Sequence, residues 1–192
     1  NGTLGKVDDA RVSAFDAGFQ HAVGLFETMM ARGSRVVHLH QHLDRLEGSL
    51  RETRLSDRLK SGPLADAIHA TVVAADLETA RVRLTISGGD LNLLHGGADG
   101  HEPTILIVAQ PATAYPDELY EKGIRTTVAD SRANPLDPFA AHKTLAYWPR
   151  LAELQSAAAK NASEALWFTV SNHLAGGCVS NVILVKDGDF VT

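Results

Sequence analysis

Hydrophobic residues near the start of the chain follow the spacing of two strands and two helices. Residues 24–30 and 35–38 predict strands on either side of a turn. Leucines then recur every three or four positions and predict an amphipathic helix that runs to about Arg54: Leu39, Leu43, Leu46 and Leu50. A second helix is expected near Pro63, because proline suits a first helical turn, with an apolar stripe of Leu64, Ile68, Val72 and Ala75.

Shorter apolar segments continue a mixed pattern. Val82, Leu84 and Ile86 alternate with polar residues and predict a half-exposed strand, whereas the continuous apolar run 104–108 predicts a buried one. The remaining expected elements are helices over 116–123 and 147–161, strands over 124–129, 165–169 and 182–185, a turn at Gly176–Gly177 and a hairpin turn over 186–189. Because strands and helices do not alternate strictly, we expect an α+β (mixed α/β) fold.

Domain organisation follows from one change in composition. Residues 131–138 hold two prolines and few apolar side chains, so we interpret them as a linker. Residues 1–130 would then form a small N-terminal α/β domain, and residues 139–192 would begin a larger domain. The chain stops at Thr192, just after the expected hairpin turn, which would leave a strand without partners. We therefore expect the sequence to be a fragment.

Composition excludes several classes of protein. The chain has 192 residues, of which 44% are hydrophobic and 21% charged, as in ordinary globular proteins. A net charge of −5 argues against nucleic acid or an anionic membrane as partner. One cysteine excludes an internal disulfide framework and favours a reducing, cytoplasmic location. The apolar runs are too short to cross a bilayer, and no signal peptide is visible at Asn1.

Three local motifs have ordinary explanations. His38, His40 and His42 would share one face of a strand, as metal ligands can, but the expected helix from Leu39 breaks that face, so we expect no metal. The glycine pairs 88–89 and 96–97 lack the Lys-Ser/Thr of a phosphate loop and are interpreted as surface loops. Cys178 is expected to be a packed thiol rather than a nucleophile.

Lys143 is the stronger chemical candidate. It lies between the expected linker and a helix, close in sequence to four apolar residues: Leu136, Phe139, Leu145 and Trp148. Partial burial among them would lower the pKa of the amine and favour a Schiff base with a carbonyl compound. A solvated surface lysine remains the alternative on these grounds.

Three separated stretches resemble the class IV (fold-type IV) pyridoxal-phosphate-dependent aminotransferases, which include branched-chain and D-amino-acid aminotransferases and 4-amino-4-deoxychorismate lyases. The first stretch, residues 12–29, is similar to the family's D-x-G-F turn and G-x-F-E-T strand. The second, residues 42–46, is similar to its H-L-D-R-L helix. The third comprises the lysine segment at 143–147, residues 157–166, which include the E-A-L strand, and residues 177–182, which are similar to the family's E-G-x-x-S-N-V-F turn. Their order and spacing agree over essentially the whole chain.

The resemblance implies roles for individual residues. Lys143 would form the Schiff base with pyridoxal 5′-phosphate and move a proton at the substrate's α-carbon. Arg45 would hold the cofactor's phosphate, although a helix-surface ion pair with Asp44 or Glu47 is the alternative. The turn of Gly177, Ser180 and Asn181 would shape the phosphate side of the pocket. Phe26 and Tyr147 would line the substrate or cofactor cavity, or belong to the core.

The expected function is transfer of an amino group between an amino acid and a 2-oxo acid by a homodimer. An aminodeoxychorismate lyase using the same lysine is one alternative. A second is a non-catalytic relative, because Gly176 stands where the family has the glutamate that pairs with the cofactor's pyridine nitrogen. The family's chain also continues beyond the equivalent of Thr192 with a further phosphate-binding helix terminus.

Overall fold

The computed structural model describes residues 1–90 and 102–191 and divides the chain into two compact units. The first unit comprises Asn1–Ala114 together with His142–Leu145, and the second comprises Tyr115–Ala141 and Ala146–Thr192. This division differs from the boundary expected at residue 130, and it assigns residues 142–145, which include Lys143, to the first unit. One glycine pair interpreted above as a surface loop, at 96–97, lies outside the described residues.

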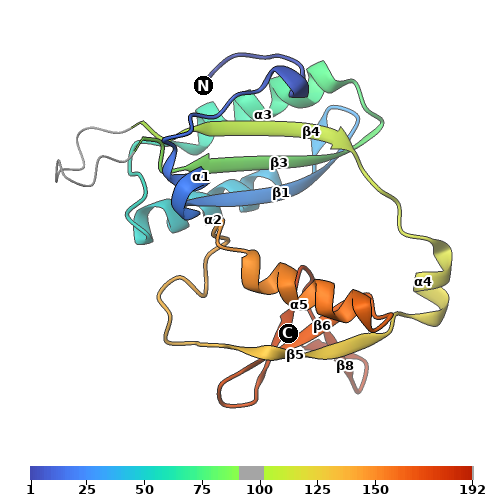
Figure 1. Cartoon of the computed structure of the whole chain (residues 1–192). Coiled ribbons are helices and arrows are strands. Elements are labelled where there is room, and N and C mark those ends of the chain that lie inside the picture. Colours follow the sequence, from blue (N-terminus) through green and yellow to red (C-terminus); the bar gives the residue numbers. More distant parts are fainter. Residues whose placement is uncertain (91–101, 192) are drawn as a thin grey trace. The chain divides into compact units, whose positions relative to one another are not determined.

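A four-stranded antiparallel sheet forms the centre of the first unit. Its strands are β1 (Gly24–Arg32), β2 (Arg35–Val36), β3 (Thr79–Ser87) and β4 (Ile105–Pro111), in the order β2-β1-β3-β4. The helices α2 (Leu39–Glu52) and α3 (Ser61–Ala75) lie on one face of this sheet (Figure 1). The 3₁₀ turn Val7–Asp9 and the short helix α1 (Ala17–His21) precede β1.

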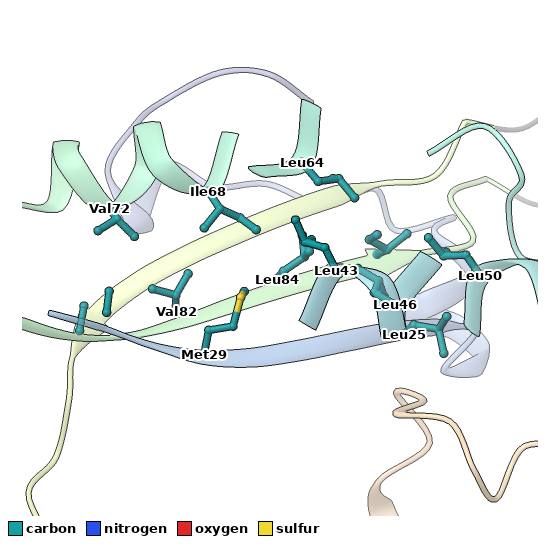
Figure 2. Close-up of a cluster of buried hydrophobic side chains, with 13 residues drawn as sticks. Leu25, Met29, Leu43, Leu46, Leu50, Leu64, Ile68, Val72, Val82 and Leu84 are labelled. Carbon is teal, nitrogen blue, oxygen red and sulfur yellow. The ribbon is translucent and has the colours of Figure 1, made fainter. Parts of the chain in front are cut away.

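The core of the first unit comes from the periodic positions that the sequence indicates. Figure 2 shows side chains of α2, α3, β1 and β3 gathered between the helices and the sheet. The expected stripe residues Leu43, Leu46 and Leu50 of α2 are buried, as are alternate residues of β3. The strand expected to be buried, β4, is only partly buried, because it pairs with β3 alone and forms an edge of the sheet.

The second unit combines one helix with a three-stranded sheet and a separate hairpin. The sheet has the order β5-β6-β7, in which β5 (Thr126–Ala133) runs parallel to β6 (Glu164–Thr169) and β7 (Leu174–Gly177) runs antiparallel to it. Between β5 and β6 the chain forms α5 (Trp148–Ala159), which packs on both strands. The helix α4 (Asp117–Lys122) precedes β5, and β8 (Leu184–Lys186) and β9 (Asp189–Val191) form the hairpin.

Two sequence-based expectations differ from the second unit. Ser131 belongs to the end of β5 rather than to a linker, because the α5 side chain of Glu153 accepts its N–H at 2.8 Å and its hydroxyl at 2.6 Å. Gly176 and Gly177 lie in β7, opposite Trp167 and Leu166, rather than in a turn. The turn occurs earlier, where Asn172 adopts a φ of 61°. In the described ranges, no helix is long and apolar enough to cross a membrane.

Candidate active site

The backbone of β1 holds the Lys143 segment in register. The Phe26 N–H donates to the Lys143 carbonyl oxygen at 2.9 Å, and the Leu145 N–H donates to the Gly24 carbonyl oxygen at 2.9 Å. Residues 143–145 thereby pair antiparallel with the first residues of β1. Gly24 makes this approach possible, since a Cβ there would lie 2.6 Å from Leu145 Cδ1 and 2.5 Å from the Ile86 oxygen.

The Lys143 amine lies over an aromatic ring. Its Nζ is 4.6 Å from the centroid of the buried Phe26 ring, and the guanidinium carbon of Arg83 is 3.9 Å from the same centroid. Such contacts are attractive because the ring face carries negative charge. Leu136, Phe139 and Trp148, the expected neighbours in sequence, are exposed and belong to the second unit. The apolar neighbour is instead Phe26, which the sequence pattern placed 117 positions away in a different motif.

Arg45 is fixed by a buried carboxylate. Its Nε donates to Glu27 Oε1 at 2.7 Å and its Nη2 to Glu27 Oε2 at 2.6 Å. His42 Nδ1 lies 2.8 Å from the same carboxylate, whose side chain is 2% exposed. The hydrogen bond to Glu27 raises the pKa of Arg45, so its charge is secure. The ion-pair partner of Arg45 is thus Glu27 of β1 and not Asp44 or Glu47, the partners in the alternative interpretation.

The ion pair between Arg45 and Glu27 uses two of the three guanidinium nitrogens. Nε and Nη2 both point to Glu27, so Nη1 is not part of the pair, and the Arg45 side chain is 53% exposed. Successive side chains of β1 point to opposite faces, so Glu27 faces α2 while Phe26 faces away from the helices. Arg45 and Lys143 thus contact two adjacent residues of β1, Glu27 and Phe26.

In the second unit, Glu164 organises the turn that follows β7. Its carboxylate accepts the Cys178 N–H at 2.9 Å, the Ser180 hydroxyl at 2.7 Å and the Val179 N–H at 3.4 Å, as well as the N–H of Ala165 at 2.9 Å. Burial alone would raise the pKa of Glu164, but these hydrogen bonds together outweigh it and hold the pKa below its usual value. The turn is therefore built on a charged carboxylate.

Glycine and arginine complete the same turn. A Cβ on Gly177 would lie 2.9 Å from Glu164 Oε2 and would clash with the Ser180 hydroxyl, so the close approach requires glycine. Arg150 Nη1 donates to the Gly177 carbonyl oxygen at 2.7 Å. Its guanidinium carbon lies 5.8 Å from the Tyr147 ring centroid and 5.2 Å from that of Trp167. Asn181 is exposed.

Gly176 carries no acid, and no neighbouring carboxylate of the turn takes its place. Its φ of 138° is a conformation that residues with a side chain rarely adopt. Glu164 is fully engaged with the turn by four donors. Cys178 is a packed thiol, as expected: it is fully buried, its Sγ accepts the Trp167 Nε1–H at 3.2 Å, and burial raises the pKa of the thiol.

The structure brings some of the expected residues together and adds others. Phe26 and Lys143 meet in the first unit, and Gly177 and Ser180 meet in the second. The sequence analysis does not single out Glu27 or Glu164. They are the glutamates of the G-x-F-E-T and E-A-L motifs, respectively. Among the described residues, no group of three or more His, Cys, Asp or Glu side chains could hold a metal ion.

Comparison with known proteins identifies what the chain is similar to. A family model described as amino-transferase class IV matches residues 24–192. A curated protein of Methanocaldococcus jannaschii, named "Putative branched-chain-amino-acid aminotransferase", is 30% identical over 98% of the chain, and the chain spans 65% of its length. The structure of Escherichia coli branched-chain amino acid aminotransferase matches 99% of the chain and 65% of its own, with a TM-score of 0.89 and 25% identity. That of Pseudomonas aeruginosa 4-amino-4-deoxychorismate lyase matches 94% of the chain and 66% of its own, with a TM-score of 0.82 and 25% identity.

Proposed function

We propose that this chain, which belongs to the class IV aminotransferase family, is part of an enzyme that moves an amino group between an amino acid and a 2-oxo acid. Enzymes of this family depend on pyridoxal 5′-phosphate (PLP). The chain spans about 65% of the relatives and structures it matches, so the activity, the cofactor and the substrates are proposed for the whole protein.

The position of Lys143 carries the proposal. A primary amine is the group that a carbonyl-bearing cofactor needs. The backbone of the Lys143 segment is held by two hydrogen bonds to β1, and the amine lies over the Phe26 ring. Its segment cannot drift along β1 without breaking both bonds. When bound, PLP supplies an electron sink for bond breaking at the substrate's α-carbon. The Lys143 Nζ would take the proton from that carbon and return one, because a single amine can act first as base and then as acid.

Arg45 is proposed to hold the cofactor's phosphate. A guanidinium offers five donors. Glu27 uses one on Nε and one on Nη2, and Nη2 also lies 3.4 Å from His42 Nδ1, so the two donors on Nη1 are proposed to bind an anion. In the second unit, Ser180, Gly177 and Asn181 are proposed to contact the cofactor through the turn that Glu164 holds. Phe26 and Tyr147 are proposed as aromatic contacts of the substrate or cofactor.

The residues present do not fit every part of the cofactor. In relatives a glutamate keeps the pyridine nitrogen protonated, but Gly176 has no side chain to do so and Glu164 is already saturated. We derive no proton transfer at the pyridine nitrogen for this reason. The mismatch supports the second candidate, a non-catalytic family member that binds little or no cofactor.

A binding experiment tests the proposal directly. The full-length protein is titrated with PLP, the visible absorbance is recorded, and the adduct is reduced with borohydride and located by peptide mass spectrometry. We expect a saturable band and a label on Lys143, both lost in Lys143→Ala and retained in Lys60→Ala, an exposed lysine of the same unit. Absence of the band, or a label elsewhere, would overturn the proposal.

The third candidate is 4-amino-4-deoxychorismate lyase activity, which the similarity to the Pseudomonas aeruginosa enzyme supports. The two reactions differ in one requirement, because a transaminase needs a 2-oxo acid to regenerate its cofactor and a lyase does not. Turnover of aminodeoxychorismate without any 2-oxo acid would favour the lyase. Dependence of turnover on a 2-oxo acid would favour the transaminase.

We further propose that the protein is a cytoplasmic homodimer with only small-molecule substrates. The dimer rests on the resemblance to the family, and the location rests on the single cysteine. Sedimentation of the full-length protein tests the dimer, and a mass of one chain at micromolar concentration would refute it.

A further inference from the structure

We propose that His142 is a positioning residue that fixes the direction of the Lys143 amine by hydrogen bonding to Ser49 of α2. The inference rests on the proposed function, in which Lys143 is the reactive amine. It adds a residue that neither the motif pattern nor the comparisons single out. Its basis is the set of contacts that His142 makes within the first unit.

The His142 side chain is enclosed and partnered. It is only 9% exposed, its Nδ1 lies 3.0 Å from Ser49 Oγ, and its Nε2 lies 3.6 Å from Glu52 Oε2. Ser49 is itself buried within α2, so a missing partner there would leave a polar atom without a hydrogen bond. The imidazole therefore ties the residue before Lys143 to a helix that is packed on the core.

The contact between His142 and Ser49 holds a side of the Lys143 segment that the backbone hydrogen bonds to β1 do not hold. The backbone hydrogen bonds to β1 involve the Lys143 carbonyl and the Leu145 N–H. They therefore hold the segment only on the carboxyl side of Lys143. His142 adds a fixed point on the amino side, and its anchor is α2 rather than β1. With both sides held, the Lys143 side chain leaves the backbone in one direction and its Nζ stays over the Phe26 ring. Loss of the His142 contact would free one side and let the amine leave the ring.

The chemistry of the contact defines the right variants. A leucine at 142 keeps the bulk of the imidazole but cannot bond to Ser49. An asparagine carries both a donor and an acceptor near the position of Nδ1, so it can serve the Ser49 hydroxyl in either role. Ser49→Ala removes the same hydrogen bond by deleting the hydroxyl on α2, which is a smaller change in side-chain volume. His40→Leu is the matched control, because His40 lies exposed on the same helix.

The first measurement needs no cofactor. The full-length protein and its variants are briefly treated with acetic anhydride, and acetylation of each lysine is quantified by peptide mass spectrometry, with Lys60 and Lys122 as internal references. We expect Lys143 in His142→Leu and in Ser49→Ala to react about threefold to tenfold faster than in wild type, the equivalent of one hydrogen bond. His142→Asn should return to the wild-type rate, and His40→Leu should not differ from it. The double variant His142→Leu/Ser49→Ala should match either single variant, because both remove one bond.

The second measurement is PLP binding by the same proteins. We expect His142→Leu to bind PLP about threefold to tenfold more weakly than wild type and His142→Asn to bind as wild type does. An unchanged Lys143 reactivity in folded His142→Leu and Ser49→Ala would overturn the inference, as would an asparagine variant that behaves like leucine. If wild type itself does not bind PLP, the proposed function fails, while the acetylation rates still decide whether His142 positions Lys143.

Discussion

Replacing Glu164 by glutamine keeps the size of a buried side chain and removes its charge. In the native protein the carboxylate accepts four hydrogen bonds, from three backbone N–H groups and the Ser180 hydroxyl. A glutamine has one oxygen to accept with, and its NH₂ group would face N–H donors. At least one of the amides of Cys178 and Val179 would then lack an acceptor. Each unsatisfied buried donor costs about 1–3 kcal/mol, so we expect Glu164→Gln to lower the free energy of unfolding by about 2–4 kcal/mol at pH 7.

The effect has a pH dependence of definite sign. Because the hydrogen bonds hold the pKa of Glu164 below its usual value, the carboxylate contributes stability that is fully present above the ordinary glutamate pKa of about 4.3. That contribution is lost as the pH falls through the lower, folded-state value. Glutamine does not titrate, so the difference between wild type and Glu164→Gln should shrink as the pH falls below about 4.

Tryptophan fluorescence is a selective assay for this prediction. Trp148 and Trp167 both belong to the second unit, and Trp167 is buried beside Cys178. We expect urea to unfold Glu164→Gln at a midpoint about 1–2 M lower than wild type at pH 7. Glu121→Gln, which changes an exposed glutamate of the same unit, should leave the midpoint unchanged. Equal midpoints for wild type and Glu164→Gln at pH 7, or a difference that does not narrow at pH 3, would refute the reasoning.

Three further substitutions have expected outcomes. Asp16→Asn weakens two bonds from buried or half-buried hydroxyls, at 2.6 and 2.7 Å, and should cost about 1–3 kcal/mol by thermal unfolding followed by circular dichroism; an unchanged Tm contradicts this. Gly24→Ala places a Cβ against Leu145, so hydrogen exchange of residues 143–145 should accelerate, and unchanged protection contradicts it. Gly176→Glu and Gly176→Ala should both lower the free energy of unfolding by about 1–3 kcal/mol, because φ at this position is 138°. Only the glutamate should raise transaminase turnover. Equal turnover in the two variants would show that position 176 is misaligned with the family's acid.

Periodic elements of the fold could be predicted from the sequence because their signals are local. The leucine spacing of α2 and the alternation of β3 each follow from one segment, and both segments bury the expected residues. The end of β5 could not be predicted in the same way. Its polar residues resemble a linker until Glu153, on a helix 22 positions later, binds the backbone of Ser131. The sequence around Ser131 gives no sign of this partner, because Glu153 comes close to it only in the folded chain.

The same limit applies to the candidate site. The motif identifies Lys143, but the ring that contacts its amine comes from β1, 117 positions earlier in the chain. The motif identifies Arg45 too, but the neighbours that α2 offers as ion-pair partners, Asp44 and Glu47, do not include its actual one. The actual partner, Glu27, lies 18 residues earlier on a strand. Side chains at neighbouring positions of a helix point in different directions, so sequence proximity alone predicts few ion pairs.

The buried acidic residues of the three sequence motifs have a common structural role. Asp16, Glu27 and Glu164 each accept hydrogen bonds from segments distant in sequence, and each is almost fully enclosed. Each acid therefore holds a segment of backbone or a cation in place. Gly176 differs from these positions in kind, because both its missing side chain and its φ of 138° separate it from an acidic residue. Because this φ strains any residue with a side chain, a glutamate introduced at position 176 should raise turnover less than one held in an unstrained conformation.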